Sequence, residues 1–179
     1  MGYWHSRGLR GSGLEEIINM TNDVYKNKGV AIIQKIPTPI TPVKIDKKNG
    51  NISLAYFEQQ STVDYIGAVQ GIPICFDAKE TNEKRLPIQN IHAHQIDFMK
   101  HFEKQGGISF LLVNFKQTDE YFYLPFNVLL EYWDNAQSGG RKSIPYSAFN
   151  SELLIFQGNG YPLNYLEALN TYLVKIRGK

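Results

Sequence analysis

The sequence is poor in the features that mark several large classes of protein. Its one cysteine, Cys75, cannot form an internal disulfide and leaves no CxxC pair or cysteine-histidine zinc finger. No segment approaches the roughly 18 apolar residues of a membrane span, and the first residues lack the apolar core of a secretion signal. We therefore expect a cytoplasmic protein with a reduced thiol, no structural zinc and no membrane contact.

The chain also lacks a strong excess of charge. Its 19 Lys and Arg residues against 17 Asp and Glu residues give a net charge of only +2, so any surface for nucleic acid must come from local basic clusters. No internal repeat, glycine-rich phosphate loop or ordered Ser, His and Asp set stands out. At 179 residues the chain is most simply one domain, residues 1–179, with a substantial core.

One stretch in the first half of the chain combines a hairpin pattern with a pair of carboxylates. If Gln70 and Gly71 form a two-residue turn, counting outward places Asp64 opposite Asp77, with Lys79 on the same face. Carboxylates directly across a strand pair repel each other unless a cation or a proton lies between them. The pattern therefore predicts a site for a hard divalent cation.

Such a site suits the hydrolysis of a phosphodiester. Asp64 and Asp77 can hold a cation against a phosphate oxygen, with the Ala78 carbonyl as a further ligand. Lys79 can orient or deprotonate the attacking water and offset developing charge. The alternative is that Asp77 and Lys79 are the exposed end of an ordinary strand.

Short motifs in a fixed order indicate a family. Asp64, Asp77 and Lys79 together resemble the PD-(D/E)XK nuclease signature, although the family discussed next usually has glutamate at the position of Asp77. Longer strings resemble the RecU family of bacterial Holliday junction resolvases, over residues from about 10 to about 145. These strings are PTP at 37–39, STVDY at 61–65, FDAKET at 76–81, HAHQI at 92–96 and GGRKSIP at 139–145.

The resemblance implies both a fold and a function. The fold would be a restriction-endonuclease-like α/β domain, a mixed central sheet flanked by helices with a protruding β-hairpin stalk. The function would be that of a Mg²⁺-dependent, structure-selective endonuclease, with Mn²⁺ as a substitute, that resolves Holliday junctions in DNA recombination and repair. A nucleoid location and action on a RecA-type recombinase and a branch-migration motor are also implied. Two alternatives stay open, namely a related nuclease with another DNA substrate and a non-catalytic junction-binding modulator of a recombinase.

Residues 37–56 are expected to form the stalk. Asn49 and Gly50 predict a type I′ turn, which places Lys44 opposite Ala55. The resemblance implies that the stalk enters the central opening of a four-way junction, where unstacked bases and phosphates offer contacts. Ordinary protection of a sheet edge by lysines is the alternative. The candidates for DNA contact in the stalk are Lys44, Lys47 and Lys48.

Residues 1–13 are expected to form a flexible basic arm, and Arg10 within it is a candidate for DNA contact. The arm leads into an expected helix that ends at Gly29. Glu15 lies in the first turn of that helix, and its string RGSGLE resembles the RGxxLE of the family. The resemblance implies that Glu15 completes the metal site, whereas a favourable interaction with the helix dipole is the alternative explanation. The apolar run over 30–35 then predicts a buried strand.

A second helix is expected to run from a cap at Asn90 to about Lys104. It places Gln95 on the packing side, where its amide needs a partner near the sheet edge at the site. The resemblance to related nucleases implies that Gln95 touches the metal-site lysine or the substrate. On a helix His92 and His94 would point about 200° apart, which argues against a chelating pair. His92 near the helix start is instead a candidate contact for a DNA phosphate.

The second half of the chain supplies one more basic candidate and the expected core. Arg141 and Lys142 lie in a glycine-containing loop that suits contact with a phosphate backbone, or that simply ends a helix. Apolar strands at 108–115 and 120–124 and a helix from Phe126 are candidates for the core and for a dimer interface. We expect a homodimer because a four-way junction has approximate two-fold symmetry and this chain shows one site.

Overall fold

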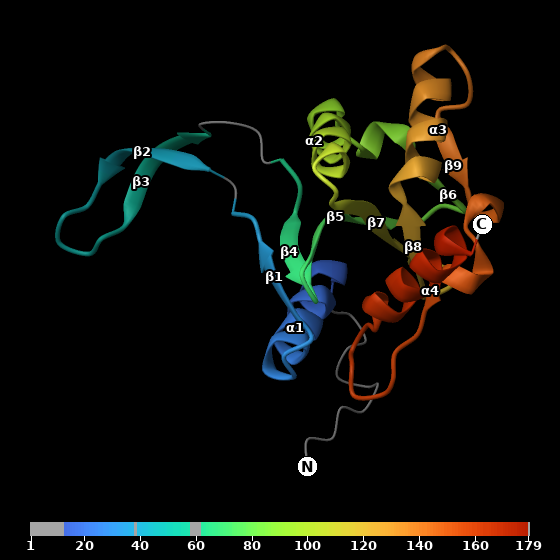
Figure 1. The fold of residues 1–179 in the computed structure, drawn as a ribbon. Coiled ribbons are helices and arrows are strands. Elements are labelled where there is room, and N and C mark those ends of the chain that lie inside the picture. Colours follow the sequence, from blue (N-terminus) through green and yellow to red (C-terminus); the bar gives the residue numbers. More distant parts are fainter. Residues whose placement is uncertain (1–12, 38, 58–61, 179) are drawn as a thin grey trace.

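The computed structural model describes residues 13–37, 39–57 and 62–178, and its centre is a six-stranded mixed sheet (Figure 1). The strand order is β1-β4-β5-β7-β8-β10, in which β5 and β7 are parallel and the other neighbours are antiparallel. Strand β7 is central, as its nearly continuous apolar sequence predicts. The strands are β1 (Ala31–Lys35), β4 (Tyr65–Val69), β5 (Ile72–Thr81), β7 (Ile108–Phe115), β8 (Glu120–Pro125) and β10 (Leu154–Ile155).

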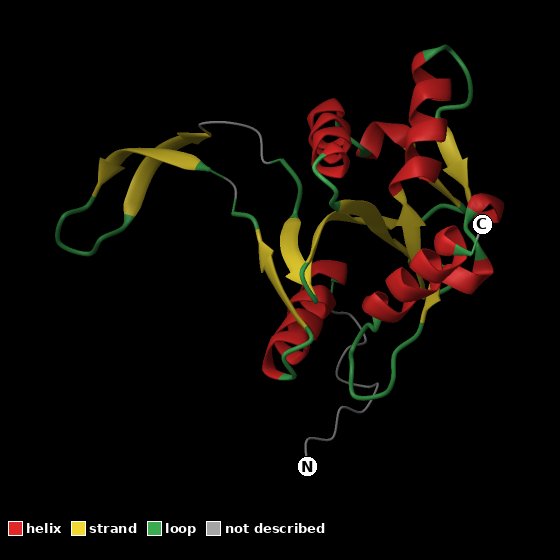
Figure 2. Ribbon diagram, in the orientation of Figure 1, coloured by secondary structure: helices red, strands yellow, loops and turns green. Residues whose placement is uncertain are grey.

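Four α-helices cover the two faces of this sheet (Figure 2). Alternate side chains of each strand point to opposite faces, so Phe76 joins one apolar cluster while its neighbour Cys75 joins the other. Helices α1 (Leu14–Asn27) and α4 (Tyr165–Arg177) pack on the first cluster, and α2 (Ala93–Lys104) and α3 (Phe126–Gln137) on the second. The predicted mixed α/β fold with a helix-flanked central sheet is confirmed.

Smaller elements complete the chain. The remaining strands form two separate two-stranded sheets, β2–β3 and β6–β9. None of the helices in the described ranges is both long and apolar enough to cross a membrane. The remaining bounds are β2 (Ile40–Ile45), β3 (Ile52–Phe57), β6 (Arg85–Pro87), η1 (Ile88–Asn90), β9 (Ser143–Pro145), η2 (Tyr146–Ala148) and η3 (Ser151–Leu153).

The β4–β5 hairpin has the predicted register. Gln70 and Gly71 have φ of 50° and 83°, as a two-residue hairpin turn of type I′ requires, and Val69 pairs with Ile72. A row of stacked rings then crosses four strands, with centroid separations of 4.8 Å, 4.8 Å and 4.5 Å, in the order Tyr65, Phe76, Phe110 and Tyr123. This packing holds β5 in a fixed position at the centre of the sheet.

The β2–β3 hairpin extends away from the sheet (Figure 1), but its predicted turn and register are wrong. Asn49 does not have the positive φ that a type I′ turn needs, and Lys44 pairs with Leu54 rather than Ala55. The Asp46 carboxylate is the cause, because it accepts bonds from the Lys48 backbone N–H at 2.9 Å and the Asn49 side chain at 3.0 Å. These bonds organise a longer loop, and one irregularity in each strand shifts the pairing.

Helix α1 ends where predicted, since Lys28 is its C-cap and Gly29 follows with φ of 65°. The prediction of a buried strand after it is wrong, because β1 forms an edge of the sheet and the Ile32 side chain is 62% exposed. The other side of α1 contacts the chain just before and within α4. There the Leu163 N–H donates to the Thr21 hydroxyl at 3.0 Å, and the Leu166 N–H to the Tyr25 hydroxyl at 3.2 Å. The C-terminal segment thereby fixes the helix that carries Glu15.

Candidate active site

Two aspartates meet at the open end of the β4–β5 hairpin. Asp64 directly precedes β4, and the register that pairs Tyr65 with Phe76 places it opposite Asp77, as predicted. Each carboxylate accepts a hydrogen bond from a backbone N–H of the other strand. The Asp64 N–H donates to Asp77 Oδ1 at 2.8 Å, and the Ala78 N–H donates to Asp64 Oδ2 at 3.0 Å. Each carboxylate is thus fixed by the backbone of the opposite strand.

The second oxygen of Asp77 contacts two side chains. Lys79 Nζ lies 2.5 Å from Oδ2, and Gln95 Nε2 donates to the same atom at 2.5 Å. Asp77 itself is fully buried, and a buried carboxylate is stable only when it is paired and hydrogen-bonded in this way. The Gln95 carbonyl oxygen meanwhile accepts the His92 N–H at 3.0 Å, so both ends of the amide are in use and its orientation is fixed. Gln95 therefore reaches the site, but its partner is Asp77 rather than Lys79.

Electrostatic repulsion marks the carboxylate pair. Burial, followed by the negative charge of Asp77, raises the pKa of Asp64 to about 6. The Ala78 N–H and the Lys79 ammonium act in the opposite direction but do not cancel these effects. A pair of partly desolvated like charges is a location where a cation binds favourably.

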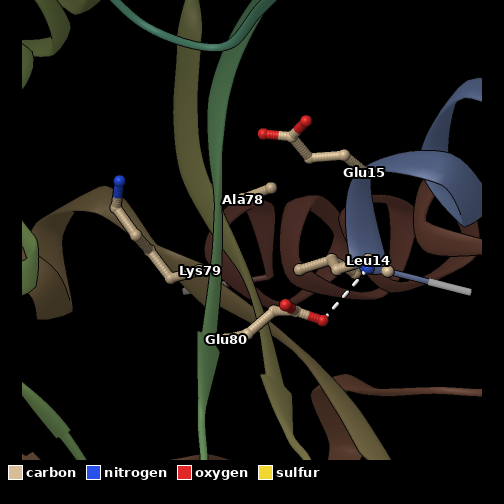
Figure 3. Close-up of a pocket in the computed structure, with 6 residues that line it drawn as sticks. Leu14, Glu15, Ala78, Lys79 and Glu80 are labelled. Atoms are coloured by element: carbon tan, nitrogen blue, oxygen red, sulfur yellow. Dashed lines mark hydrogen bonds between the residues drawn. The ribbon is translucent and has the colours of Figure 1, made fainter. Parts of the chain in front are cut away.

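A pocket of about 450 Å³ opens on the α1 side of β5 (Figure 3). In Figure 3 the Glu15 carboxylate extends from α1 over Ala78, whereas Lys79 extends to the other side of the strand. Glu15 forms an ion pair with Lys35, and both side chains are about half exposed. Glu15 therefore borders the same space as Ala78 but does not contact Asp64 or Asp77 in any bond that the structure records.

The donor set fits a hard divalent cation. Two carboxylates, Asp64 and Asp77, stand next to the Ala78 carbonyl on one strand end, and oxygen ligands of this kind are those that Mg²⁺ prefers. Across the described parts of the chain, no three His, Cys, Asp or Glu side chains gather closely enough to hold an ion by themselves. Any bound ion would accordingly use backbone or water oxygens besides the two aspartates, or a rearranged Glu15.

The start of α2 differs from the prediction in two respects. The N-cap is His92 rather than Asn90, which belongs to the preceding short η1 helix. Because His92 has an extended backbone, the helical spacing argument does not apply to it. The rings of His92 and His94 stack with centroids 5.4 Å apart and an interplanar angle of 7°, instead of pointing apart. His92 is exposed at the helix N-terminus, three residues from Gln95.

The structure places the remaining basic candidates in two regions. Arg141 and Lys142 precede β9, and the Ile88 N–H donates to the Lys142 carbonyl at 3.1 Å, which brings this loop beside the segment leading to α2. Arg141 Nε also contacts the Ser143 hydroxyl at 3.3 Å. The other region is the projecting hairpin, with the exposed residues Lys44, Lys47 and Lys48. Arg10, with nearly all of the expected basic arm, lies outside the described residues.

Two residues near the site were missed by sequence reasoning. Glu80 accepts the Leu14 N–H at 3.1 Å and pairs with Lys116 at 2.9 Å, so it joins the first turn of α1 to β5. Strand alternation alone places Glu80 on the same face as Ala78, and this signal could have found it. Lys35 was also missed, since nothing in its local sequence indicates that it pairs with Glu15, twenty residues before it.

Comparison with known proteins assigns the sequence to a family. Residues 9–171 match the profile of the family described as Recombination protein U. The chain belongs to that family. The Recombination protein U match includes Glu15, both hairpins, α2 and the loop with Arg141 and Lys142.

Named relatives of the Recombination protein U family cover most of this chain. "Holliday junction resolvase RecU" of Oenococcus oeni is 44% identical over 90% of this chain and 85% of its own length. The protein of the same name from Pediococcus pentosaceus is 44% identical over 88% of this chain and 77% of its own. Among solved structures, Archaeoglobus fulgidus Hjc, titled a Holliday junction resolvase, overlaps partially. It covers 63% of this chain and 75% of its own, with a TM-score of 0.37 and 8% identity.

Proposed function

We propose that this protein is a divalent-metal-dependent, structure-selective endonuclease that resolves four-way DNA junctions during recombination and repair. The observation that carries the proposal is the Asp64, Asp77 and Lys79 constellation at one strand end, in a chain whose relatives are named as Holliday junction resolvases. Its substrate implies a cytoplasmic, nucleoid-associated location. Action on a RecA-type recombinase and a branch-migration motor belongs to the same proposal.

The side chains divide the work as follows. Asp64 and Asp77, with the Ala78 carbonyl, would hold Mg²⁺ or Mn²⁺, and Glu15 would assist from the pocket. When bound, the ion polarises the scissile phosphate and lowers the pKa of a coordinated water. Gln95 keeps Asp77 oriented through its bond to Oδ2.

Lys79 would act on the attacking water. Its ammonium lies beside Asp77 and its side chain is only 14% exposed, so the charge acts in a partly desolvated setting where it has a large effect. There it can orient the water and offset the negative charge that develops on the phosphate oxygens. Lys79→Ala should therefore reduce kcat rather than junction affinity.

Basic residues around the site would position the junction. Lys47 and Lys48 at the tip of the projecting hairpin suit the junction centre, and the exposed Lys44 follows along its side. The second group flanks the start of α2 and suits duplex phosphates near the cleavage point. It comprises His92, Arg141 and Lys142. Arg10, which lies outside the described residues, stays a candidate from the sequence alone.

We propose a homodimer, since two symmetric cuts need two sites. Of the interface candidates from the sequence, β7 and β8 are buried within the core and cannot serve. Helix α3 buries only Phe126 and Leu129, so it stays a candidate. The hairpin is the better candidate, because it exposes large apolar side chains that a second copy could cover. These are Ile40, Val43, Ile45, Ile52, Leu54 and Tyr56, each 46% to 58% exposed.

Light scattering tests the dimer. We expect about twice the chain mass of 20.5 kDa, and a shift toward the monomer in Leu54→Ser, which places a polar group in the apolar surface. Phe156→Ser is the matched control, because Phe156 is 70% exposed but lies outside the hairpin. A monomer at the concentrations at which paired cuts still occur would contradict the proposal.

One cleavage assay tests the enzymatic proposal. Four-way, forked and linear DNA are each incubated with the protein, with Mg²⁺ and with a chelator instead. Paired cuts in the four-way junction that need the metal and disappear in Asp77→Asn are the expected result. Equal cleavage of all three substrates would point to a nuclease of the same fold with another substrate, and tight junction binding without cleavage would point to a non-catalytic modulator.

A further inference from the structure

The root of the projecting hairpin contacts the proposed metal site twice. Lys35, the last residue of β1, forms the ion pair with Glu15, and the next residue, Ile36, donates its N–H to the Asp64 carbonyl at 2.8 Å. The second strand of the hairpin, β3, ends at Phe57, seven residues before Asp64. Only short stretches of chain therefore separate the projecting hairpin from the residues of the proposed metal site.

The backbone around Glu15 is firmly held. The preceding Leu14 N–H donates to Glu80 at 3.1 Å, and the Tyr65 hydroxyl shares its one proton between Asn19 Oδ1 at 3.0 Å and the Glu15 carbonyl at 3.3 Å. Tyr65 is fully buried, so this anchor is part of the core. Only the Glu15 carboxylate is free to change its partner, since its side chain is 51% exposed and that of Lys35 is 44% exposed.

We propose that Lys35 is a positioning residue that holds the Glu15 carboxylate in the free protein and exchanges it for a DNA phosphate when substrate enters. Glu15 then turns toward the divalent cation. This inference rests on the proposed function. At the Lys35 ammonium the DNA phosphate replaces the Glu15 carboxylate. Glu15 in turn exchanges the single positive charge of Lys35 for the double positive charge of the cation.

The energetics permit this exchange. Ion pairs between exposed side chains contribute little to stability, so the Lys35–Glu15 pair is easily broken by a stronger partner. A DNA phosphate and a divalent cation are such partners, because the phosphate arrives within a dense row of negative charges and the cation carries two positive charges. If the pair were only a surface contact, removing it would leave metal affinity and DNA affinity unchanged.

Calorimetry with Mn²⁺ in the absence of DNA tests the first half of the exchange. We expect Lys35→Met to bind Mn²⁺ about two- to fivefold more tightly than the unmodified protein, because Glu15 no longer has a competing partner. Lys116→Met is the matched control, since Lys116 pairs with Glu80, which lines the same pocket. Its Mn²⁺ affinity should not change.

A second substitution separates this effect from the simple loss of a positive charge. In the Glu15→Gln background, Lys35→Met should no longer increase Mn²⁺ affinity, because the released carboxylate is absent. The same increase in that background would overturn the inference, since it would reflect charge removal alone. An unchanged affinity in the single variant Lys35→Met would overturn it as well.

DNA binding tests the second half. Lys35→Met should bind a four-way junction several-fold more weakly and reduce the salt dependence of binding by about one phosphate contact. Tighter metal binding with weaker DNA binding in one variant is the expected signature, and an unchanged junction affinity would contradict the exchange. If the unmodified protein binds no Mn²⁺, or Asp77→Asn binds it equally well, the proposed function fails and this inference with it. If only Lys35→Met is without effect, the inference alone fails.

Discussion

The two hairpins of this chain carry similar two-residue turn sequences but lie in different surroundings. The β4–β5 hairpin has helices over both faces, and its residues Ile74, Cys75 and Phe76 are fully buried. Within the described ranges the strands of the β2–β3 hairpin pair only with each other, and most of its large apolar side chains are about half exposed. The first has the register that its turn predicts, and the second does not.

Burial explains this difference. A one-residue slip in β4–β5 would move every core side chain to the opposite face, so packing enforces the register that the turn suggests. A slip in the exposed hairpin changes little burial. A single local acceptor, the Asp46 carboxylate, is then enough to choose a longer loop. The catalytic candidates lie on the hairpin whose geometry is fixed, and the flexible choice of register is confined to the one expected to contact DNA.

The largest effect should come from the buried hairpin. Asp77→Asn should lower junction cleavage by about 1000-fold or more, because it removes a charged metal ligand at a site where preorganised electrostatics dominate. Junction binding should stay the same or improve, since a negative charge near the phosphates is lost. Single-turnover cleavage and a binding assay on the same samples separate the two effects, with the exposed Asp97→Asn as a control. Cleavage at the unmodified rate would refute the metal assignment.

Packing should respond nearly as strongly. Phe76→Ala, at the middle of the ring row, should lower the free energy of unfolding by about 3–5 kcal/mol through the cavity that it leaves. Leu54→Ala in the exposed hairpin should change the unfolding of the monomer by only about 0.5 kcal/mol. Chemical denaturation of both variants at low protein concentration measures the contrast. Equal losses would show that the exposed hairpin also contributes to the folded core.

A smaller effect is expected at the tip of the exposed hairpin. Replacing Lys47 and Lys48 together by alanine should weaken four-way junction binding by about tenfold, with a smaller loss on linear duplex, because only the junction offers phosphates around a central opening. Cleavage at saturating junction should be nearly unchanged. Gel-shift titrations at one fixed salt concentration measure both affinities. A uniform loss on the two substrates would identify these lysines as general phosphate contacts.

The smallest effect concerns the charge of Asp64 in the metal-free protein. Its pKa is raised from 3.8 to about 6 on folding, so folding favours the protonated carboxyl. This contribution to stability is complete below about pH 4 and is lost as the pH rises through about 6. After allowance for partial exposure, we expect a loss of about 1 kcal/mol. Thermal denaturation in a chelator, compared between the unmodified protein and Asp64→Asn, should show that only the former loses this amount.

Local sequence determined much of the fold. Sequence signals located α1 and α3, the apolar run of β7 predicted its central position, and the Gln70–Gly71 turn gave the cross-strand pair of aspartates. These signals succeed because each depends on neighbours along the chain or on a core that enforces one register. The Gln95 prediction succeeded for a related reason, since a buried amide must find a partner.

Only the tertiary structure decided the remaining features. His92 became the helix cap, and its ring stacks on that of His94. Strand β1 lies at the edge of the sheet with one face exposed, and Glu15 pairs with Lys35, twenty residues further along the chain. In each case the outcome depends on which distant segments meet, or on the backbone conformation of a single residue at the end of an element. Sequence periodicity carries no information on either. The chain therefore encodes its carboxylate pair locally, whereas the link between that pair and the projecting hairpin exists only in the folded protein.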